Sequence, residues 1–288
     1  IDTTEIWGMD NLQDPSGIIK ESQELAAQAF GAKHTLYSIN GTTGGIYIGL
    51  STVTNPGDKI LIQRNSHKSV YNAALLNRLN IEYIYPNYNE RYQVLTGIDP
   101  EDIEAKLKKD RDIQVVVITY PNYYGICSDI RRISEIVHKY DKILLVDEAH
   151  GSHFVFSDRL PISALEAGAD IAVQSTHKTL ASFTQSSMIH IGTDRVDIDK
   201  LMDMSAMYQS TSPSYMLMLS LEIARAYMEG EGRCKLEECL SLLQDTTKRL
   251  IDIKGVHVFI GDEGDNTIYH KDPMKILFRL DGMTGTSL

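Results

Sequence analysis

Lys178 lies in surroundings that are unusual for a lysine on a protein surface. It ends the segment Gln-Ser-Thr-His-Lys, residues 174–178, which directly follows the apolar run 171–173. A partly desolvated amine has a lowered pKa and can act as a nucleophile toward an aldehyde. The neighbouring hydroxyls and the imidazole of His177 could also hold a phosphate group. The ordinary alternative is a lysine that merely ends a strand in solvent.

A glycine-rich turn gives a second chemical signal. Residues 40–45, Asn-Gly-Thr-Thr-Gly-Gly, follow a predicted strand at 35–39 and open a predicted helix. Glycines let the backbone approach an anion closely, and a helix N-terminus offers unpaired N–H groups and the positive end of a dipole. Gly41, Thr42 and Thr43 are therefore candidates for a phosphate site. The pattern is neither a Walker motif nor Gly-x-Gly-x-x-Gly, and an ordinary capped turn remains the alternative.

A carboxylate and a flat ring follow two other predicted strands. Asp147 lies in Val-Asp-Glu-Ala-His, residues 146–150, at the carboxyl end of a strand, where parallel α/β sheets bind ligands. A buried carboxylate needs a cationic partner, which a protonated pyridine nitrogen would supply. Ala149 is small enough for a flat ring to lie close to the backbone, and His67 could stack on that ring. A capping aspartate and a solvent-facing histidine are the alternatives.

Two further segments have weaker signals. His150 and His153 are spaced three apart, but no third ligand accompanies them, so we expect no metal. Residues 120–125, Tyr-Pro-Asn-Tyr-Tyr-Gly, could line the same cleft or form an aromatic turn without a ligand.

The phosphate site, the ring platform, the carboxylate and the amine all fall at predicted strand ends. It is less probable that all four features occur at strand ends by chance than that any one of them does. Together these features suggest pyridoxal 5′-phosphate (PLP) bound to Lys178 as a Schiff base.

Short β-branched runs alternate with amphipathic stretches between residues 35 and 192. This alternation predicts an α/β fold with three layers, αβα, and a mostly parallel sheet of about seven strands. The run Val-Val-Val-Ile at 115–118 is typical of a strand buried on both faces. Besides 35–39, the predicted strands are 59–63, 81–85, 115–120, 143–148, 171–176 and 188–192. The predicted helices between them are 69–79, 100–109 with Asp99 as N-cap, 129–140 and 161–167.

The two ends of the chain differ from this pattern. A helix at 16–32, capped by Ser16, is predicted before the first strand. Later segments favour helices at 213–229 and 232–253 and strands at 256–260 and 275–280. We therefore expect a large PLP-binding domain with an N-terminal helix at 1–212, and at 213–288 long helices and the start of a truncated α+β C-terminal unit.

Composition excludes several classes of protein. The net charge of −11 argues against binding to nucleic acid or to an anionic membrane and weakly fits a cationic substrate. No apolar run approaches the roughly 20 residues that span a bilayer. Cys127, Cys234 and Cys239 form neither a disulfide framework nor a zinc pattern, which suggests free thiols in the cytoplasm. The chain begins at Ile1, and we expect a fragment of a longer protein.

With these motifs in this order, the chain resembles the major PLP-binding domain of the Orn/Lys/Arg decarboxylases. That family is a branch of the fold-type I PLP enzymes, with the aspartate aminotransferase fold. The resemblance runs from about Thr4 to Gly285. The segments that carry it are 40–43, 63–69, 147–151, 175–178, 185–187 and 209–215.

The resemblance implies a role for each candidate residue. Lys178 would carry the Schiff base and Asp147 would pair with the pyridine nitrogen. His67 would stack on the ring, and His177 or Lys178 would donate a proton. The residues that would hold the phosphate are Thr42, Thr43, Ser175 and His177. Residues 209–212 would reach the cofactor of a neighbouring subunit, which implies a homodimer or a larger homo-oligomer.

The activity implied is decarboxylation of arginine, lysine or ornithine to a polyamine precursor, namely agmatine, cadaverine or putrescine. Another fold-type I reaction, such as an aminotransferase or aldolase, is an alternative. So is an inactive fragment that acts by binding a subunit, since the family usually has segments before Ile1 and beyond Leu288.

Overall fold

The computed structural model describes residues 8–261 and 264–285. Thr4, where the resemblance begins, and the outer ends of the two expected domains lie outside the described residues. No helix within the described ranges is both long and apolar enough to cross a membrane.

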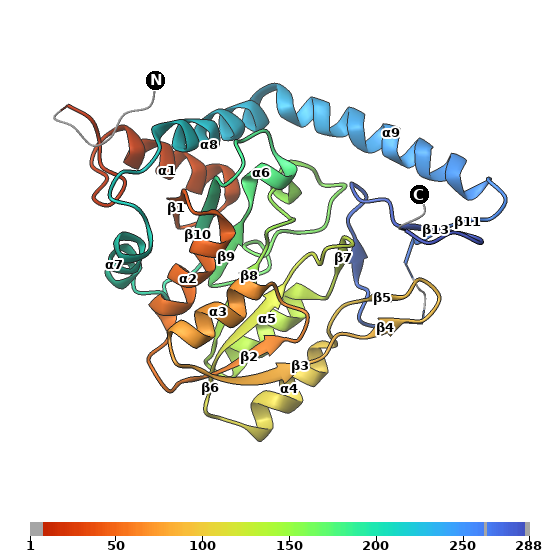
Figure 1. Ribbon diagram of the computed structural model, residues 1–288, viewed down its shortest axis with the longest axis horizontal. Helices are drawn as coiled ribbons and strands as arrows, with labels where there is room; N and C mark the ends of the chain where they lie inside the picture. Colours follow the sequence, from red (N-terminus) through yellow and green to blue (C-terminus); the bar gives the residue numbers. More distant parts are fainter. Residues whose placement is uncertain (1–7, 262–263, 286–288) are drawn as a thin grey trace.

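A seven-stranded sheet forms the centre of the molecule, in the order β1-β10-β9-β8-β6-β2-β3 (Figure 1). The strands β9, β8, β6, β2 and β3 are parallel, whereas β10 runs antiparallel to both of its neighbours. The strands are β1 (His34–Ser38), β2 (Lys59–Gln63), β3 (Asn80–Ile84), β6 (Ile113–Thr119), β8 (Ile143–Asp147), β9 (Ile171–Gln174) and β10 (Ser187–Ile191). Because β10 is antiparallel to both β1 and β9, those two strands run in the same direction and end at the same edge of the sheet.

Helices cover both faces of this sheet, which confirms the predicted αβα layers. Val115 and Val117 of β6 pack with α2 (Gly41–Val53), α3 (Lys68–Leu76) and α7 (Ile198–Tyr208). Val116 and Ile118 face the other way. They pack with the side that holds α1 (Ile18–Phe30), α4 (Pro100–Lys109), α5 (Ile130–Lys139) and α8 (Tyr215–Tyr227). Burial on both faces explains the continuous apolar run in this strand.

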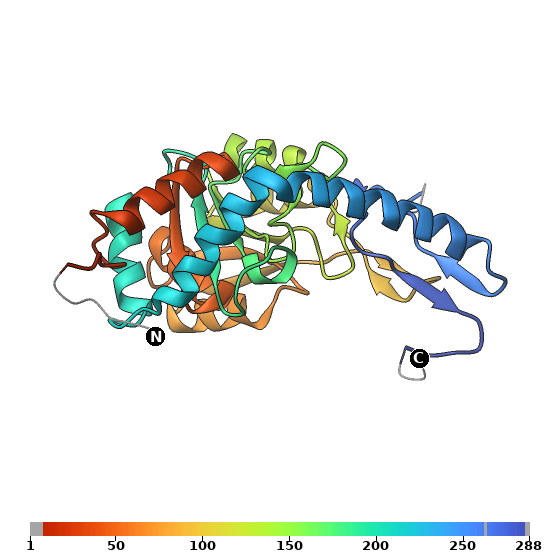
Figure 2. The same cartoon turned by 90° about the horizontal axis from the view of Figure 1, so that it is seen from above.

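The chain leaves the sheet domain along a long helix and then returns to it (Figures 1 and 2). After α8, a π-helical turn (Met228–Gly232) leads into α9 (Arg233–Ile251). β11 (Val256–Val258) and β13 (Phe278–Leu280) form a small antiparallel pair. Between them β12 (His270–Lys271) pairs with β7 (Ile126–Cys127). We call residues 265–277 the returning segment. The remaining short elements are β4 (Tyr88–Asn89), β5 (Val94–Leu95), α6 (Thr176–Thr179) and a 3-10 turn (Phe154–Phe156).

Two predicted local features were wrong. Ser16 does not cap α1, because the carboxylate of Asp10 accepts the N–H groups of Gly17 at 3.0 Å and Ile19 at 2.7 Å. Residues 161–167 contain no helix, and a turn forms at 164–168. There the side chain of Glu148 accepts the N–H of Ala164 at 2.7 Å, and the N–H of Ala167 donates to the carbonyl of Ser163 at 3.1 Å, but the turn does not continue as a helix. The predicted cap Asp99 is confirmed, since it accepts the N–H of Glu101 at 2.9 Å.

Candidate active site

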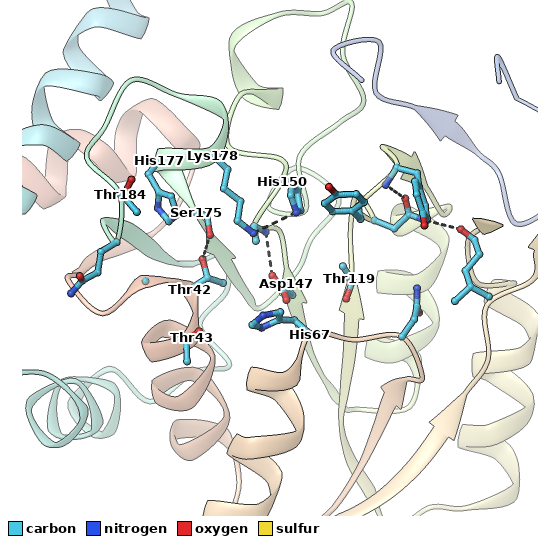
Figure 3. A pocket seen from close by; sticks show the side chains of 18 of the residues that line it. Thr42, Thr43, His67, Thr119, Asp147, His150, Ser175, His177, Lys178 and Thr184 are labelled. Atoms are coloured by element: carbon cyan, nitrogen blue, oxygen red, sulfur yellow. Dashed lines mark hydrogen bonds between the residues drawn. The ribbon is translucent and has the colours of Figure 1, made fainter. Parts of the chain in front are cut away.

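A cavity of about 630 Å³ opens at the edge of the sheet where β2, β6, β8 and β9 end. Its volume lies within the range typical of small-molecule sites. All of the predicted cofactor-binding residues line it: Gly41, Thr42, Thr43, His67, Asp147, Ala149, Ser175, His177 and Lys178. Figure 3 shows most of these side chains directed toward one space. The parallel strand order brings them together from distant parts of the sequence.

Hydroxyl groups and a helix start meet at one end of the cavity. The hydroxyls of Thr42 and Ser175 form a short hydrogen bond (Figure 3). Gly41 has a φ of +65°, and its N–H donates to the carbonyl of Gln185 at 2.8 Å. These contacts tie the N-terminus of α2 to the segment after β9. The first-turn N–H groups of a helix have no partner within the helix, so this end suits an anion.

His177 has a more restricted role than the sequence suggested. Its Nδ1 lies 2.7 Å from the carbonyl oxygen of Ser186, so this nitrogen carries the hydrogen and donates. In the neutral ring, Nε2 is then an acceptor. His177 can donate a hydrogen bond to a phosphate only when its imidazole is protonated.

Asp147 lies at the carboxyl end of β8 and is 3% exposed. Burial raises its pKa above the usual range, and the N–H of Ala149, at 3.2 Å from Oδ1, and the charge of Lys178 partly oppose this rise. Among the described residues no cationic side chain pairs with it directly. A buried carboxylate without a counter-ion at the floor of a cavity is well suited to a cationic ligand atom.

His67 is held in one orientation beside this carboxylate. Its Nδ1 accepts the N–H of Ser69 at 3.3 Å and contacts the hydroxyl of the same residue at 2.9 Å, so the ring caps α3. The side chain is nevertheless exposed to the cavity. Figure 3 shows the ring beside Asp147. An exposed but oriented imidazole can serve as a stacking platform for a flat ligand.

Lys178 projects from the short helix α6 into the middle of the cavity (Figure 3). Loss of hydration lowers the pKa of its amine, and the carboxylate of Asp147 acts in the opposite direction. Its Nζ lies 3.4 Å from Nε2 of His150. The amine is therefore biased toward the uncharged form that a nucleophile requires.

Several polar groups of the cavity have no hydrogen-bond partner among the described residues. Oγ1 of Thr119 and Oδ1 of Asn65 are buried and unpaired, and both residues line the cavity. Buried polar atoms normally find partners, so a polar ligand in this space would satisfy them. The residues described contain no cluster of three or more His, Cys, Asp or Glu side chains arranged to hold a metal ion.

The sequence did not identify every residue of the site. His150 lines the cavity, although the sequence suggested only a metal role for it. Its position three residues after Asp147 was the available signal. Lys275, from the returning segment, contacts His150 at 2.9 Å, and no local pattern marks it. Of residues 120–125, Asn122, Tyr123 and Tyr124 line the cavity.

Gln209 departs from its predicted role. Its side chain is 7% exposed and is held inside the subunit, where Oε1 accepts the N–H of Ile39 at 2.9 Å. Its Nε2 donates to the carbonyl of Tyr37 at 3.2 Å. Residues 210–212 are exposed, so contact with a neighbouring subunit stays a prediction for those three residues.

Known proteins are similar to this chain in sequence and in fold. A family model described as Orn/Lys/Arg decarboxylase, major domain, matches residues 1–286. The arginine decarboxylase of Bacillus subtilis (strain 168) is 40% identical over 289 residues, which cover 99% of this chain and 59% of the relative. Lysine decarboxylase LdcA of Pseudomonas aeruginosa is 31% identical over 252 residues, which cover 80% of this chain and 34% of the relative.

A solved structure, lysine decarboxylase A from Pseudomonas aeruginosa, superposes with a TM-score of 0.85 at 24% identity. The match covers 99% of this chain and 46% of that one, and shows the shared fold. The chain thus spans less than two thirds of the length of these relatives. The chain belongs to the Orn/Lys/Arg decarboxylase family, whose major domain it matches on a fold-type I α/β scaffold.

Proposed function

We propose that this chain forms the PLP-binding part of a decarboxylase that acts on a basic amino acid. The observation that carries the proposal is the pair formed by Asp147 and Lys178. A buried carboxylate without a counter-ion and an amine of lowered pKa face one cavity, and hydroxyls at its end suit a phosphate. PLP matches all three features.

When bound, PLP supplies an aldehyde to which amines bond covalently and a pyridinium ring that accepts the electron pair left when carbon dioxide departs. The residues of this chain would hold and tune it. Lys178 would provide the amine, and Asp147 would keep a proton on the ring nitrogen. His67 would orient the ring. Thr42, Thr43 and Ser175 would hold the phosphate together with the N-terminus of α2.

The substrate we propose is arginine, lysine or ornithine, with agmatine, cadaverine or putrescine as the product. The names of the relatives support this class, because they include arginine and lysine decarboxylases. The lining of the cavity contains one carboxylate, that of Asp147, among the described residues. A group that binds the distal cation of the substrate would therefore come from elsewhere, such as a second subunit. The other source is the part of the relatives' length that this chain does not span. We propose a homodimer as the active unit.

Two measurements test the proposal. PLP added to the protein should give a visible absorption band that borohydride removes, and Lys178→Ala should lose the band while its circular dichroism stays unchanged. Release of labelled carbon dioxide from arginine, lysine and ornithine would then identify the substrate. Covalently bound cofactor in Lys178→Ala would contradict the assignment of the amine. A band without carbon dioxide release would favour another fold-type I reaction.

A further inference from the structure

One imidazole that lines the cavity contacts a lysine amine at each of its two nitrogens. Nζ of Lys275 lies 2.9 Å from Nδ1 of His150, and Nζ of Lys178 lies 3.4 Å from Nε2 of the same ring. Figure 3 shows the contact between Lys178 and His150. The three side chains come from the returning segment, from the end of β8 and from α6. His150 and Lys178 line the cavity, whereas Lys275 does not and contacts the other nitrogen of the His150 ring.

The protons of this chain of contacts can be assigned from donor and acceptor chemistry. A lysine ammonium has donors only, and a protonated imidazole also has donors only. A neutral ring has one donor and one acceptor nitrogen, so it fits both contacts of His150 when one of the two amines is charged and the other is not. Consistent with this, the pKa of His150 is lowered to about 3, and burial is the largest cause.

Lys275 has the surroundings of a charged amine. Besides Nδ1 of His150, it donates to the carbonyl of Tyr123 at 3.1 Å, and its Nζ lies 5.5 Å from the centre of the Tyr123 ring. Two acceptors and an aromatic face all favour an ammonium group. Burial lowers the pKa of Lys275, but the buried carboxylate of Asp272 attracts the charge of the ammonium and partly opposes this decrease in pKa.

The charge on Lys275 determines where the proton of His150 lies. An ammonium that donates to Nδ1 leaves the ring hydrogen on Nε2, which faces Lys178. An N–H at that place can form a hydrogen bond with an uncharged lysine amine, which has a lone pair, but not with an ammonium. The contact therefore favours the uncharged form of Lys178.

The fold holds Lys275 in this place. Asp272 donates its N–H to the carbonyl of Gly125 at 2.7 Å, and β12 pairs with β7 just before it. Gly125 has a φ of +80°, and a Cβ there would lie 3.2 Å from Cβ of Lys275. The backbone of the returning segment is thus packed closely against the turn that follows β6.

We propose that Lys275 is a positioning residue: its ammonium fixes His150 as the neutral Nε2–H tautomer, and that N–H keeps the amine of Lys178 uncharged and oriented. The proposal rests on the proposed function only in naming Lys178 as the amine that bonds to the cofactor. The other charged or titratable groups that face these three residues include Asp147, His153, Asp272, Cys127, Lys271 and Tyr123.

Histidine ¹⁵N NMR of the cofactor-free protein tests the tautomer directly. We expect one ring in the neutral Nε2–H form whose signals disappear in His150→Gln. In Lys275→Met the signals of that ring should shift toward a mixture of the two tautomers. Lys248→Met, which removes an exposed lysine of α9 paired with Asp245, should leave them unchanged. An Nδ1–H tautomer in the parent protein, or no change in Lys275→Met, would overturn the proposal.

The rate at which added PLP develops its visible band, measured against pH, tests the consequence for Lys178. Lys275→Met should be slower near neutral pH by roughly fivefold, the worth of one hydrogen bond, and should approach the parent at high pH. Lys275→Arg keeps a charged donor and should restore much of the rate. Equal rates and equal pH profiles for the parent and Lys275→Met would contradict the inference. No band in the parent protein would instead contradict the proposed function and leave the NMR result to decide the tautomer.

Discussion

The hydroxyl groups of Thr42 and Ser175, which are 133 residues apart in the sequence, form a short hydrogen bond at one end of the cavity. This contact joins the first turn of α2 to the end of β9. Both hydroxyls are candidates for phosphate binding, so they connect the scaffold to the proposed cofactor.

Thr42→Val should weaken PLP binding by roughly fivefold, because a methyl group of similar size replaces one hydrogen-bonding hydroxyl. Fluorescence or absorbance titration with PLP would measure this loss. Thr246→Val is a matched control, because the hydroxyl of Thr246 bonds only to its own helix, at the carbonyl of Leu242. If Thr42→Val bound PLP as tightly as the parent, the phosphate would lie elsewhere.

Asp147→Asn should lower decarboxylation and yet stabilise the cofactor-free protein. Burial raises the pKa of Asp147, so the folded protein loses stability as the pH rises above the unfolded pKa of this carboxyl. Removing the charge should raise the melting temperature of the cofactor-free protein at pH 7. Turnover of the loaded enzyme should fall by roughly a hundredfold, because a buried charge loses its partner. A lower melting temperature together with unchanged turnover would show a purely structural carboxylate.

Glu148 should make stability fall as the pH rises. Burial raises its pKa from 4.5 to about 8, against the hydrogen bonds from Gln174 and Ala164. A raised pKa means that its contribution is complete below pH 4.5 and is lost toward pH 8. Each pH unit in this window costs up to about 1.4 kcal/mol.

Glu148→Gln should therefore flatten the dependence of melting temperature on pH between these limits. Glu82→Gln, which changes a half-exposed carboxylate, is the control. A slope as steep in Glu148→Gln as in the parent would assign the effect to other groups.

Gly45→Ala should destabilise the protein by roughly 1–3 kcal/mol. An added Cβ would lie 2.4 Å from Cγ1 of Val173 and 3.2 Å from Cγ1 of Ile189, so α2 would have to move away from β9 and β10. Urea unfolding would measure the change. Gly285→Ala should change stability little, because a Cβ there meets nothing within 4 Å among the described residues other than its chain neighbours. Equal midpoints for both variants would contradict the close packing of α2 on the sheet.

Local sequence predicted much of the scaffold and of the proposed cofactor site. The positions of Asp147 and Lys178 could be predicted because Asp147 ends one strand and Lys178 closely follows another, and both strands are evident from their apolar residues. Parallel strands end at one edge of the sheet, so the two residues lie at the same edge. The cytoplasmic location, the domain boundary at residue 212 and the subunit contact stay predictions.

Contacts over long sequence separations could not be predicted in this way. The carboxylate of Asp10 caps α1, and the side chain of Glu148 accepts the N–H of Ala164, so each of these contacts comes from a residue outside the element. Lys275 has no periodicity or motif that connects it with His150, from which it is 125 residues distant. Its place depends on the pairing of β12 with β7.

The position of the returning segment late in the sequence determines the order in which the residues near Lys178 are synthesised. Lys178 and His150 emerge long before Lys275, and α9 must be synthesised in between. Because domains fold during synthesis from the N-terminal end, the sheet and the residues that line the cavity can be in place before Lys275 reaches His150. A nascent chain that stops before residue 265 would therefore present Lys178 without the lysine that, on our proposal, sets its charge. The contacts that act on the amine of Lys178 would therefore be completed only after the sheet around it has folded.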